Sequence, residues 1–177
     1  MKKVLLLAVM AVAFQFIKAQ EPLSFEKIIV VDSVSKDIIF SKVSEWIASN
    51  FITTDGDYYT NRQDGIITKD YQFSYKYGSF IYAAYDGIIR CKIKVAVKDG
   101  KFKVTIYNFI HKAIERHKQL EDFSMNLLTL AEKSGKGGLN KSGHDKVWKS
   151  MKDYCQKIAE TNFIEIEKIN FKKEDNW

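Results

Sequence analysis

Four Asp-Gly pairs divide the middle of the sequence and constrain its fold more than any other feature. They are Asp55-Gly56, Asp64-Gly65, Asp86-Gly87 and Asp99-Gly100. Asp-Gly supplies the positive φ that tight hairpin turns need. Because the segments between the pairs are rich in β-branched and aromatic residues, this spacing predicts an antiparallel meander over residues 57–110.

The two segments around the last pair alternate most clearly between apolar and polar residues. Within residues 88–98 the apolar series is Ile89, Cys91, Ile93, Val95 and Val97, with Arg90, Lys92, Lys94, Ala96 and Lys98 between its members. Residues 102–107 repeat the alternation. One face of each strand is therefore expected to be buried and the other to face water.

Helical periodicity occurs on both sides of the meander. After a predicted first strand over residues 25–31, apolar residues recur at three- and four-residue intervals from Ile39 to Phe51, and they include Trp46 as a core residue. Ser33 or Ser35 is the expected N-cap. A second helix is predicted over residues 145–161.

The region between the meander and the last helix has weaker signals. Residues 120–133 could form a short helix. Residues 134–143 contain four glycines and no apolar periodicity, so we predict a flexible loop there.

This order of elements predicts the α+β class. A curved antiparallel sheet of about five strands, with helices packed on one face, follows from the order β-α-β-β-β-β-α.

Several segments carry a family resemblance. They are Phe25-Glu26-Lys27-Ile28-Ile29-Val30-Val31, the following Ser35-Lys36-Asp37 with Trp46, the hairpin from Val97 to Phe109, and the late Val147-Trp148. Together they resemble an exported bacterial family known as a domain of unknown function with a TBP-like fold. The resemblance implies the sheet shape that is shared with TATA-binding protein, and it implies neither DNA binding nor any site residue.

The N-terminus has the features of a secretory signal peptide. Two lysines at positions 2 and 3 precede an apolar stretch over residues 4–17, and Ala19 provides a small residue at a cleavage point. A membrane-spanning helix needs about 20 apolar residues, which is more than this stretch provides. We therefore predict a signal peptide over residues 1–19 and a single exported domain over residues 20–177, periplasmic or secreted, with no stable membrane insertion after cleavage.

The charge balance limits the partners that we expect. Cleavage after Ala19 would leave 25 basic against 22 acidic residues, a net charge of +3 in place of +6. An excess of this size concerns solubility and does not argue for nucleic acid. The expected partner is an unknown protein or small ligand of the cell envelope.

Cys91 and Cys155 are the two cysteines of the chain. Both lie on predicted buried faces, so a disulfide between them and two free packing thiols are both open. We favour the free thiols. Burial would also leave Cys91 inert as a nucleophile.

No other constellation predicts a catalytic, metal or cofactor site. His111, His117 and His144 lack the spacing of zinc ligands, so we expect surface or strand-end histidines. The segment from Gly135 to Ser142 approaches a phosphate-binding P-loop but has Asn140 where that motif needs glycine. The carboxylates are scattered singly.

The densest aromatic stretch precedes the basic strand face of Arg90, Lys92 and Lys94. It comprises Tyr71, Phe73, Tyr75, Tyr77, Phe80, Tyr82 and Tyr85. Aromatic residues are good sheet formers, which is the interpretation that we favour. Aromatics interleaved with cations can also stack on bases or sugars and bind anions.

Three hypotheses of function follow. The first is a non-catalytic binding or interaction module of the periplasm or cell surface, which uses the open side of the sheet or the cavity between sheet and helices. The alternatives are a hydrolase-type enzyme whose site forms only on folding, and a component of an envelope assembly with residues 111–143 as its docking element.

Overall fold

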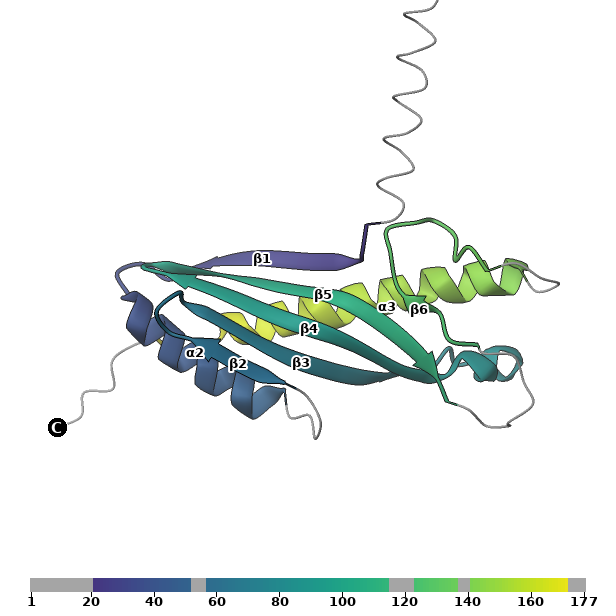
Figure 1. The fold of residues 1–177 in the computed structure, drawn as a ribbon, viewed down its shortest axis with the longest axis horizontal. Coiled ribbons are helices and arrows are strands. Elements are labelled where there is room, and N and C mark those ends of the chain that lie inside the picture. Colours follow the sequence, from purple (N-terminus) through teal and green to yellow (C-terminus); the bar gives the residue numbers. More distant parts are fainter. Residues whose placement is uncertain (1–20, 52–56, 115–122, 137–140, 172–177) are drawn as a thin grey trace, which may run out of the picture.

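In the described part of the chain, six antiparallel strands form one sheet, and two long helices pack against the same face of it (Figure 1). The computed structural model describes residues 21–51, 57–114, 123–136 and 141–171. The strands are β1 Ser24–Val30, β2 Tyr58–Asn61, β3 Ile66–Tyr75, β4 Gly87–Lys98, β5 Lys101–Ala113 and β6 Asn126–Leu127. The helices are α2 Lys36–Asn50 and α3 Lys141–Glu167, with a short 3₁₀ helix, η1, at Phe80–Tyr85.

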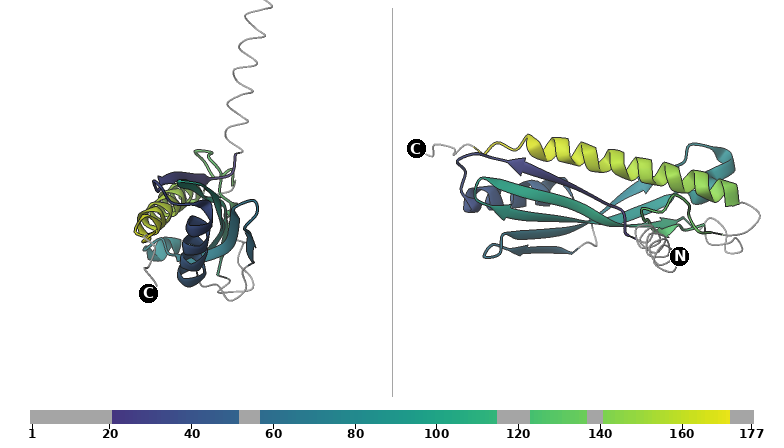
Figure 2. Two further views of the ribbon diagram at one scale, coloured as in Figure 1. Left: turned by 90° about the vertical axis from the view of Figure 1, so that its left-hand side faces the viewer. Right: turned by 90° about the horizontal axis from the view of Figure 1, so that it is seen from above.

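The strand order across the sheet is β1-β5-β4-β3-β2, and β6 adds a short pairing to β5. Figure 2 shows both long helices on one side of the sheet, which curves around them. The predicted α+β fold, with a curved antiparallel sheet and helices on one face, is therefore confirmed, as are the β4–β5 hairpin and the first strand.

The core lies between the sheet and the helices because one set of alternating residues points inward. On β4 this set is Ile89, Cys91, Ile93, Val95 and Val97, all buried. The helices contribute stripes at three- and four-residue spacing, namely Ile39, Phe40, Val43 and Ile47 from α2, and Val147, Met151, Cys155 and Ala159 from α3. Burial of these apolar surfaces is the main stabilising contribution to the fold.

Two of the predicted Asp-Gly turns are observed and one is not. Gly65 and Gly100 have φ of 69° and 70° and close the β2–β3 and β4–β5 hairpins. Asp86-Gly87 instead marks the start of β4, where Gly87 has no positive φ. Asp55-Gly56 lies outside the described residues.

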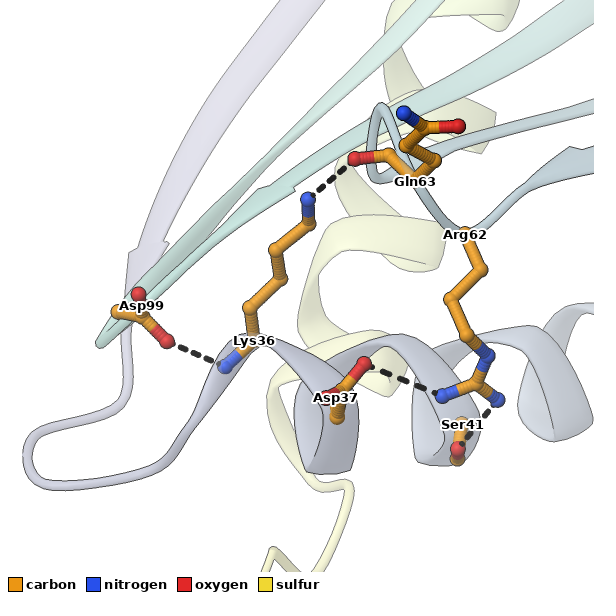
Figure 3. A network of polar contacts seen from close by, with 6 residues as sticks. All are labelled: Lys36, Asp37, Ser41, Arg62, Gln63 and Asp99. Atoms are coloured by element: carbon orange, nitrogen blue, oxygen red, sulfur yellow. Dashed lines mark hydrogen bonds and ion pairs between the residues drawn. The ribbon is translucent and has the colours of Figure 1, made fainter.

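The N-cap prediction for α2 is right about the position and wrong about the capping hydrogen bond. Ser35 occupies the N-cap position, yet its side chain makes no capping hydrogen bond. The backbone N–H of Lys36 donates to Oδ1 of Asp99 at 2.7 Å, so the β4–β5 turn caps the helix from outside (Figure 3). Ser33 has a φ of 64° and lies in the preceding turn.

The β2–β3 turn also fastens this end of α2. The ammonium of Lys36 donates to the carbonyl of Gln63 at 2.7 Å, and Arg62 donates to Ser41 Oγ at 2.9 Å and pairs with Asp37 at 3.4 Å. Figure 3 shows both side chains bridging the helix and the turn. These contacts hold the first turn of α2 against two hairpins.

Trp46 is half-buried and not a fully buried core residue. Its ring lies at the rim of the core, 5.4 Å from the ring of Phe51. The core face of α2 passes through Val43 and Ile47, and Trp46 is one residue before Ile47 and therefore lies beside that stripe.

The region before α3 differs from the expectation. No helix forms over the described residues 123–133, because their backbone groups bond to the sheet and to the N-terminal segment: Leu128 donates to Phe109 at 2.8 Å, and Leu130 donates to Glu21 at 2.9 Å. Helix α3 begins at Lys141 and continues past residue 161, because Phe163 and Ile166 prolong its buried stripe.

The predicted flexible loop at residues 134–143 is therefore shorter than expected, since residues 141–143 are helical. Ser134 is held by the side chain of Asp145, which accepts from its backbone N–H at 3.0 Å. Residues 137–140 lie outside the described part of the chain. Over the described ranges, no helix has both the length and the hydrophobicity that a membrane span requires.

Candidate binding surface

His111 and His144 lie inside the protein, which corrects the expectation of surface or strand-end histidines. Nδ1 of His144 is 2.6 Å from the hydroxyl of Tyr85, and Nδ1 of His111 accepts from the backbone N–H of Met125 at 3.0 Å. The contact of His111 ties the segment after β5 to the sheet, and the contact of His144 ties the start of α3 to η1. His117 lies outside the described residues, among which no three His, Cys, Asp or Glu side chains gather as metal ligands.

Both cysteines are free and buried, as favoured from the sequence. Burial, with a smaller contribution from the nearby Asp70, raises the pKa of the Cys91 thiol to about 12. Burial also raises the pKa of Cys155, with a smaller contribution from Cys91. A thiol that stays protonated is a poor nucleophile, so neither cysteine is prepared for covalent chemistry.

The near match to a P-loop does not have the surroundings of one. Its middle residues, 137–140, lie outside the described part of the chain, and Lys141 and Ser142 begin α3. The described residues before it, 128–136, are not a strand, whereas a P-loop follows a strand directly.

The aromatic stretch does not share a face with the basic residues of β4. Tyr71 pairs with Cys91 and Phe73 with Ile89, so these rings point toward the helices. Tyr75 and Tyr85 are buried, and Tyr77 and Tyr82 pack against the core. The favoured interpretation of these aromatics as structural residues therefore holds for all of them except Phe80, which is exposed.

The other face of the sheet carries no helix, and we call it the open face. It is formed by the outward-pointing residues of β1, β3, β4 and β5. Seven basic side chains occupy its outward register positions, namely Arg90, Lys92, Lys94, Lys98, Lys101, Lys103 and Lys112. Asp57, just before β2, contributes to the raised pKa of Lys92. The acidic residues within the strands of this face are Glu26 and Asp70.

These two carboxylates neutralise two of the lysines. Lys92 pairs with Asp70 at 2.9 Å, and the hydrogen bond to that carboxylate raises the pKa of Lys92. Lys103 pairs with Glu26 at 3.2 Å.

Three exposed cations remain along β4. Among the described residues, Arg90, Lys94 and Lys98 have no ion-pair partner. They are four residues apart, so they recur about every 13 Å along the strand. Lys101 and Lys112 on β5 are also exposed and have no ion-pair partner among the described residues, so the row on β4 is the longest run of such cations on the open face.

Two tyrosines stand near this row. Tyr107 is the neighbour of Lys92 on β5, and Tyr59 is opposite Thr68, which in turn pairs with Lys94. The sequence alternation placed the cations of β4 and Tyr107 on outward faces, but only the pairing register brings Tyr59 and Tyr107 beside the row. Flat rings beside cations can stack on sugar rings while the cations bind acidic groups.

The comparisons agree with this architecture. Residues 25–112 match the family model described as "Domain of unknown function (DUF4468) with TBP-like fold". The chain belongs to the DUF4468 family. None of the curated proteins matches it.

Two solved structures share the DUF4468 fold of this chain. A TBP-like protein from Parabacteroides distasonis is 10% identical, with a TM-score of 0.58 over 84% of this chain and 95% of the other. A DUF4468 family protein from Bacteroides ovatus is 12% identical, with a TM-score of 0.59 over 86% and 90% of the two chains. At these identities the likeness concerns the fold alone.

Proposed function

We propose that the chain is an exported, non-catalytic binding module that holds an anionic, chain-like ligand of the cell envelope on the open face of its sheet. The observation that carries the proposal is the row of Arg90, Lys94 and Lys98, exposed and without ion-pair partners among the described residues. Cations about 13 Å apart cannot bind one small anion together, but they can bind successive groups of an extended one. Tyr59 and Tyr107 favour an acidic polysaccharide, because their rings can stack on sugars.

Calorimetry with polygalacturonate, and with neutral dextran as the comparison, tests this surface. The Lys94→Glu/Lys98→Glu variant should bind polygalacturonate at least about tenfold more weakly, and added salt should weaken the wild type. Lys149→Glu/Lys157→Glu is the matched control, because it makes the same change in net charge on the exposed side of α3.

Three results would contradict the proposal. Equal losses in the two variants would mean that only net charge matters, and equal binding of dextran would remove the role of charge. Tighter binding of double-stranded DNA than of polygalacturonate would point to nucleic acid.

Export is a separate part of the proposal with its own measurement. Mass spectrometry of periplasmic or secreted material should find a chain that begins near Gln20, as the pattern of residues 1–19 predicts. A membrane-embedded product that retains Met1 would contradict it.

The geometry of the described residues does not favour the two alternatives. A hydrolase needs its reactive groups in a cleft that substrate can enter, whereas the described thiols and histidines are buried in the core. For an envelope assembly, residues 126–130 of the suggested docking element already pair with β5 and the N-terminal segment.

A further inference from the structure

Two adjacent apolar side chains at the start of η1 project into solvent. Phe80 is 96% exposed and Ile81 is 82% exposed, and we call this pair the apolar tip. Single exposed apolar residues are common on protein surfaces, but two large neighbours exposed to this extent are not. In Figure 1, η1 is the teal helix at the end of the sheet far from the β4–β5 turn.

The apolar tip is presented by a well-packed segment. Tyr82 contacts the rings of Tyr77 at 4.8 Å and Tyr85 at 6.3 Å, and Tyr85 is buried. Carboxylate oxygen Oδ1 of Asp86 accepts from the backbone N–H of Tyr77 at 3.1 Å, which closes the segment on itself. The rest of η1 is therefore anchored while its first two residues stay outside the core.

Further apolar and basic groups lie around the tip. Ile114 is 52% exposed, and its N–H donates to the carbonyl of Asp86 at 3.0 Å, directly after η1. Lys76 is exposed at the end of β3, and Lys112 is exposed opposite Ile88 at the start of β4. Both cations thus lie at the same end of the sheet as the apolar tip.

We propose that this end of the molecule docks on an anionic lipid surface, with the apolar tip in the interfacial region and Lys76 and Lys112 at the headgroup phosphates. An apolar protrusion with cations at the same end of the molecule has the chemistry of interfacial anchors, which bury apolar side chains at the acyl boundary and attract anionic headgroups. A convex protrusion fits a fluid bilayer, which deforms around it, whereas a protein partner would need a matching pocket. The unpaired cations of the open face add attraction of the same sign.

Vesicle co-sedimentation of the protein, as recovered from its own cell, tests the docking. Vesicles of phosphatidylcholine alone are compared with vesicles that also contain about a third phosphatidylglycerol. The wild type should partition onto the anionic vesicles, and Phe80→Ser/Ile81→Ser should reduce this partitioning at least about tenfold. Lys76→Glu/Lys112→Glu should reduce it only on the anionic vesicles.

The matched control is Ile28→Ser/Val30→Ser, which removes two apolar side chains, 61% and 65% exposed, from β1 on the open face. It should sediment like the wild type. A Phe80→Trp variant gives a direct readout, because its emission should shift to shorter wavelength when anionic vesicles are added. Unchanged melting temperatures would establish that all variants are folded.

Three outcomes would overturn the proposal. They are no sedimentation of the wild type, equal losses for the tip and β1 variants, and an emission of the Phe80→Trp variant that vesicles leave unchanged. Self-association in sedimentation velocity that Phe80→Ser/Ile81→Ser abolishes would assign the tip to a second copy of the chain. Loss of polygalacturonate binding with intact vesicle docking would contradict only the open-face function.

Discussion

Gly65 and Gly87 both follow an aspartate, but the structure uses them for different reasons. Gly65 has a φ of 69°, a left-handed conformation that costs little only for glycine. Gly87 lies in ordinary strand conformation, and its missing Cβ makes room for the neighbouring strand. A Cβ there would lie 2.2 Å from the carbonyl oxygen of Lys112 and 2.7 Å from Nε2 of His111. The Asp-Gly pattern therefore provides a positive φ at Gly65 and room for a close backbone contact at Gly87.

Replacing Gly87 by alanine should lower the free energy of unfolding by about 3 kcal/mol, because the contact with Lys112 is to backbone and cannot be relieved by a side-chain rotation. Gly78→Ala is the control, since its Cβ would meet nothing within 4 Å and only the φ of 79° is unfavourable. That control should cost about 1 kcal/mol. Urea unfolding measures both, and equal losses would contradict the steric explanation.

Alkaline pH should destabilise the protein through its buried thiols. Burial raises the pKa of Cys91 from 9.0 to about 12, so the unfolded chain releases this proton at lower pH than the folded one. The stabilisation is complete below pH 9 and is lost as the pH rises toward 12. Between pH 9 and 10, Cys91 should account for a loss of about 1 kcal/mol. In urea unfolding, Cys91→Ala should reduce the loss by that amount, and an unchanged slope would contradict a buried neutral thiol.

At the scale of the elements, α2 shows how a turn and a helix depend on each other. The helix is amphipathic in its own sequence, but its first backbone N–H finds its acceptor on Asp99, 63 residues away. The β2–β3 turn adds the contacts of Lys36 and Arg62 (Figure 3). Helix α2 is thus positioned by two hairpins that belong to the sheet it covers.

Asp99→Ala should cost about 1 to 2 kcal/mol of unfolding free energy, the usual loss for an N-cap acceptor. Ser35→Ala should change it by less than about 0.5 kcal/mol, because Ser35 makes no capping hydrogen bond. The two variants are compared by urea unfolding at neutral pH. A larger loss from Ser35→Ala would mean that the helix is capped locally.

At the scale of the whole molecule, the two faces of one sheet have separate roles. The inward face packs against α2 and α3 and supplies the core, whereas the open face carries unpaired cations, and the apolar tip stands at one end. Strand β5 is the centre of this arrangement, because it pairs with β1, β4 and β6. The short strand β2 lies at the edge and pairs only with β3.

Amide hydrogen exchange should be slower in the central strands of the sheet than in the edge strand β2. Amides of β4 and β5 that pair with each other should exchange slowest, at rates set by global unfolding, because no local opening exposes them. Amides of β2 should exchange through local opening, at least about a hundredfold faster. Exchange followed residue by residue by NMR measures both, and equal protection of β2 and β4 would contradict a marginal edge strand.

The sequence by itself determined which residues of β4 and β5 are buried, since a strand alternates its side chains with a fixed period of two. It also determined the period of α2, the position of the Gly65 and Gly100 turns, and the burial of both cysteines. These properties are local, because backbone geometry converts a pattern of neighbours directly into a face or a turn. The family resemblance rested on the same local patterns.

Only the tertiary structure decided which chain segments meet across the sheet. Asp99 caps α2 because the β4–β5 turn lies against the start of that helix. The strand register places His111 against Gly87 and Tyr107 beside Lys92. The irregular segment 123–130 became an edge of the sheet and not a helix, since its backbone groups bond to Phe109 and Glu21. Such partners leave no periodic signal in the sequence, because a hydrogen bond between remote residues depends on where the whole fold places them.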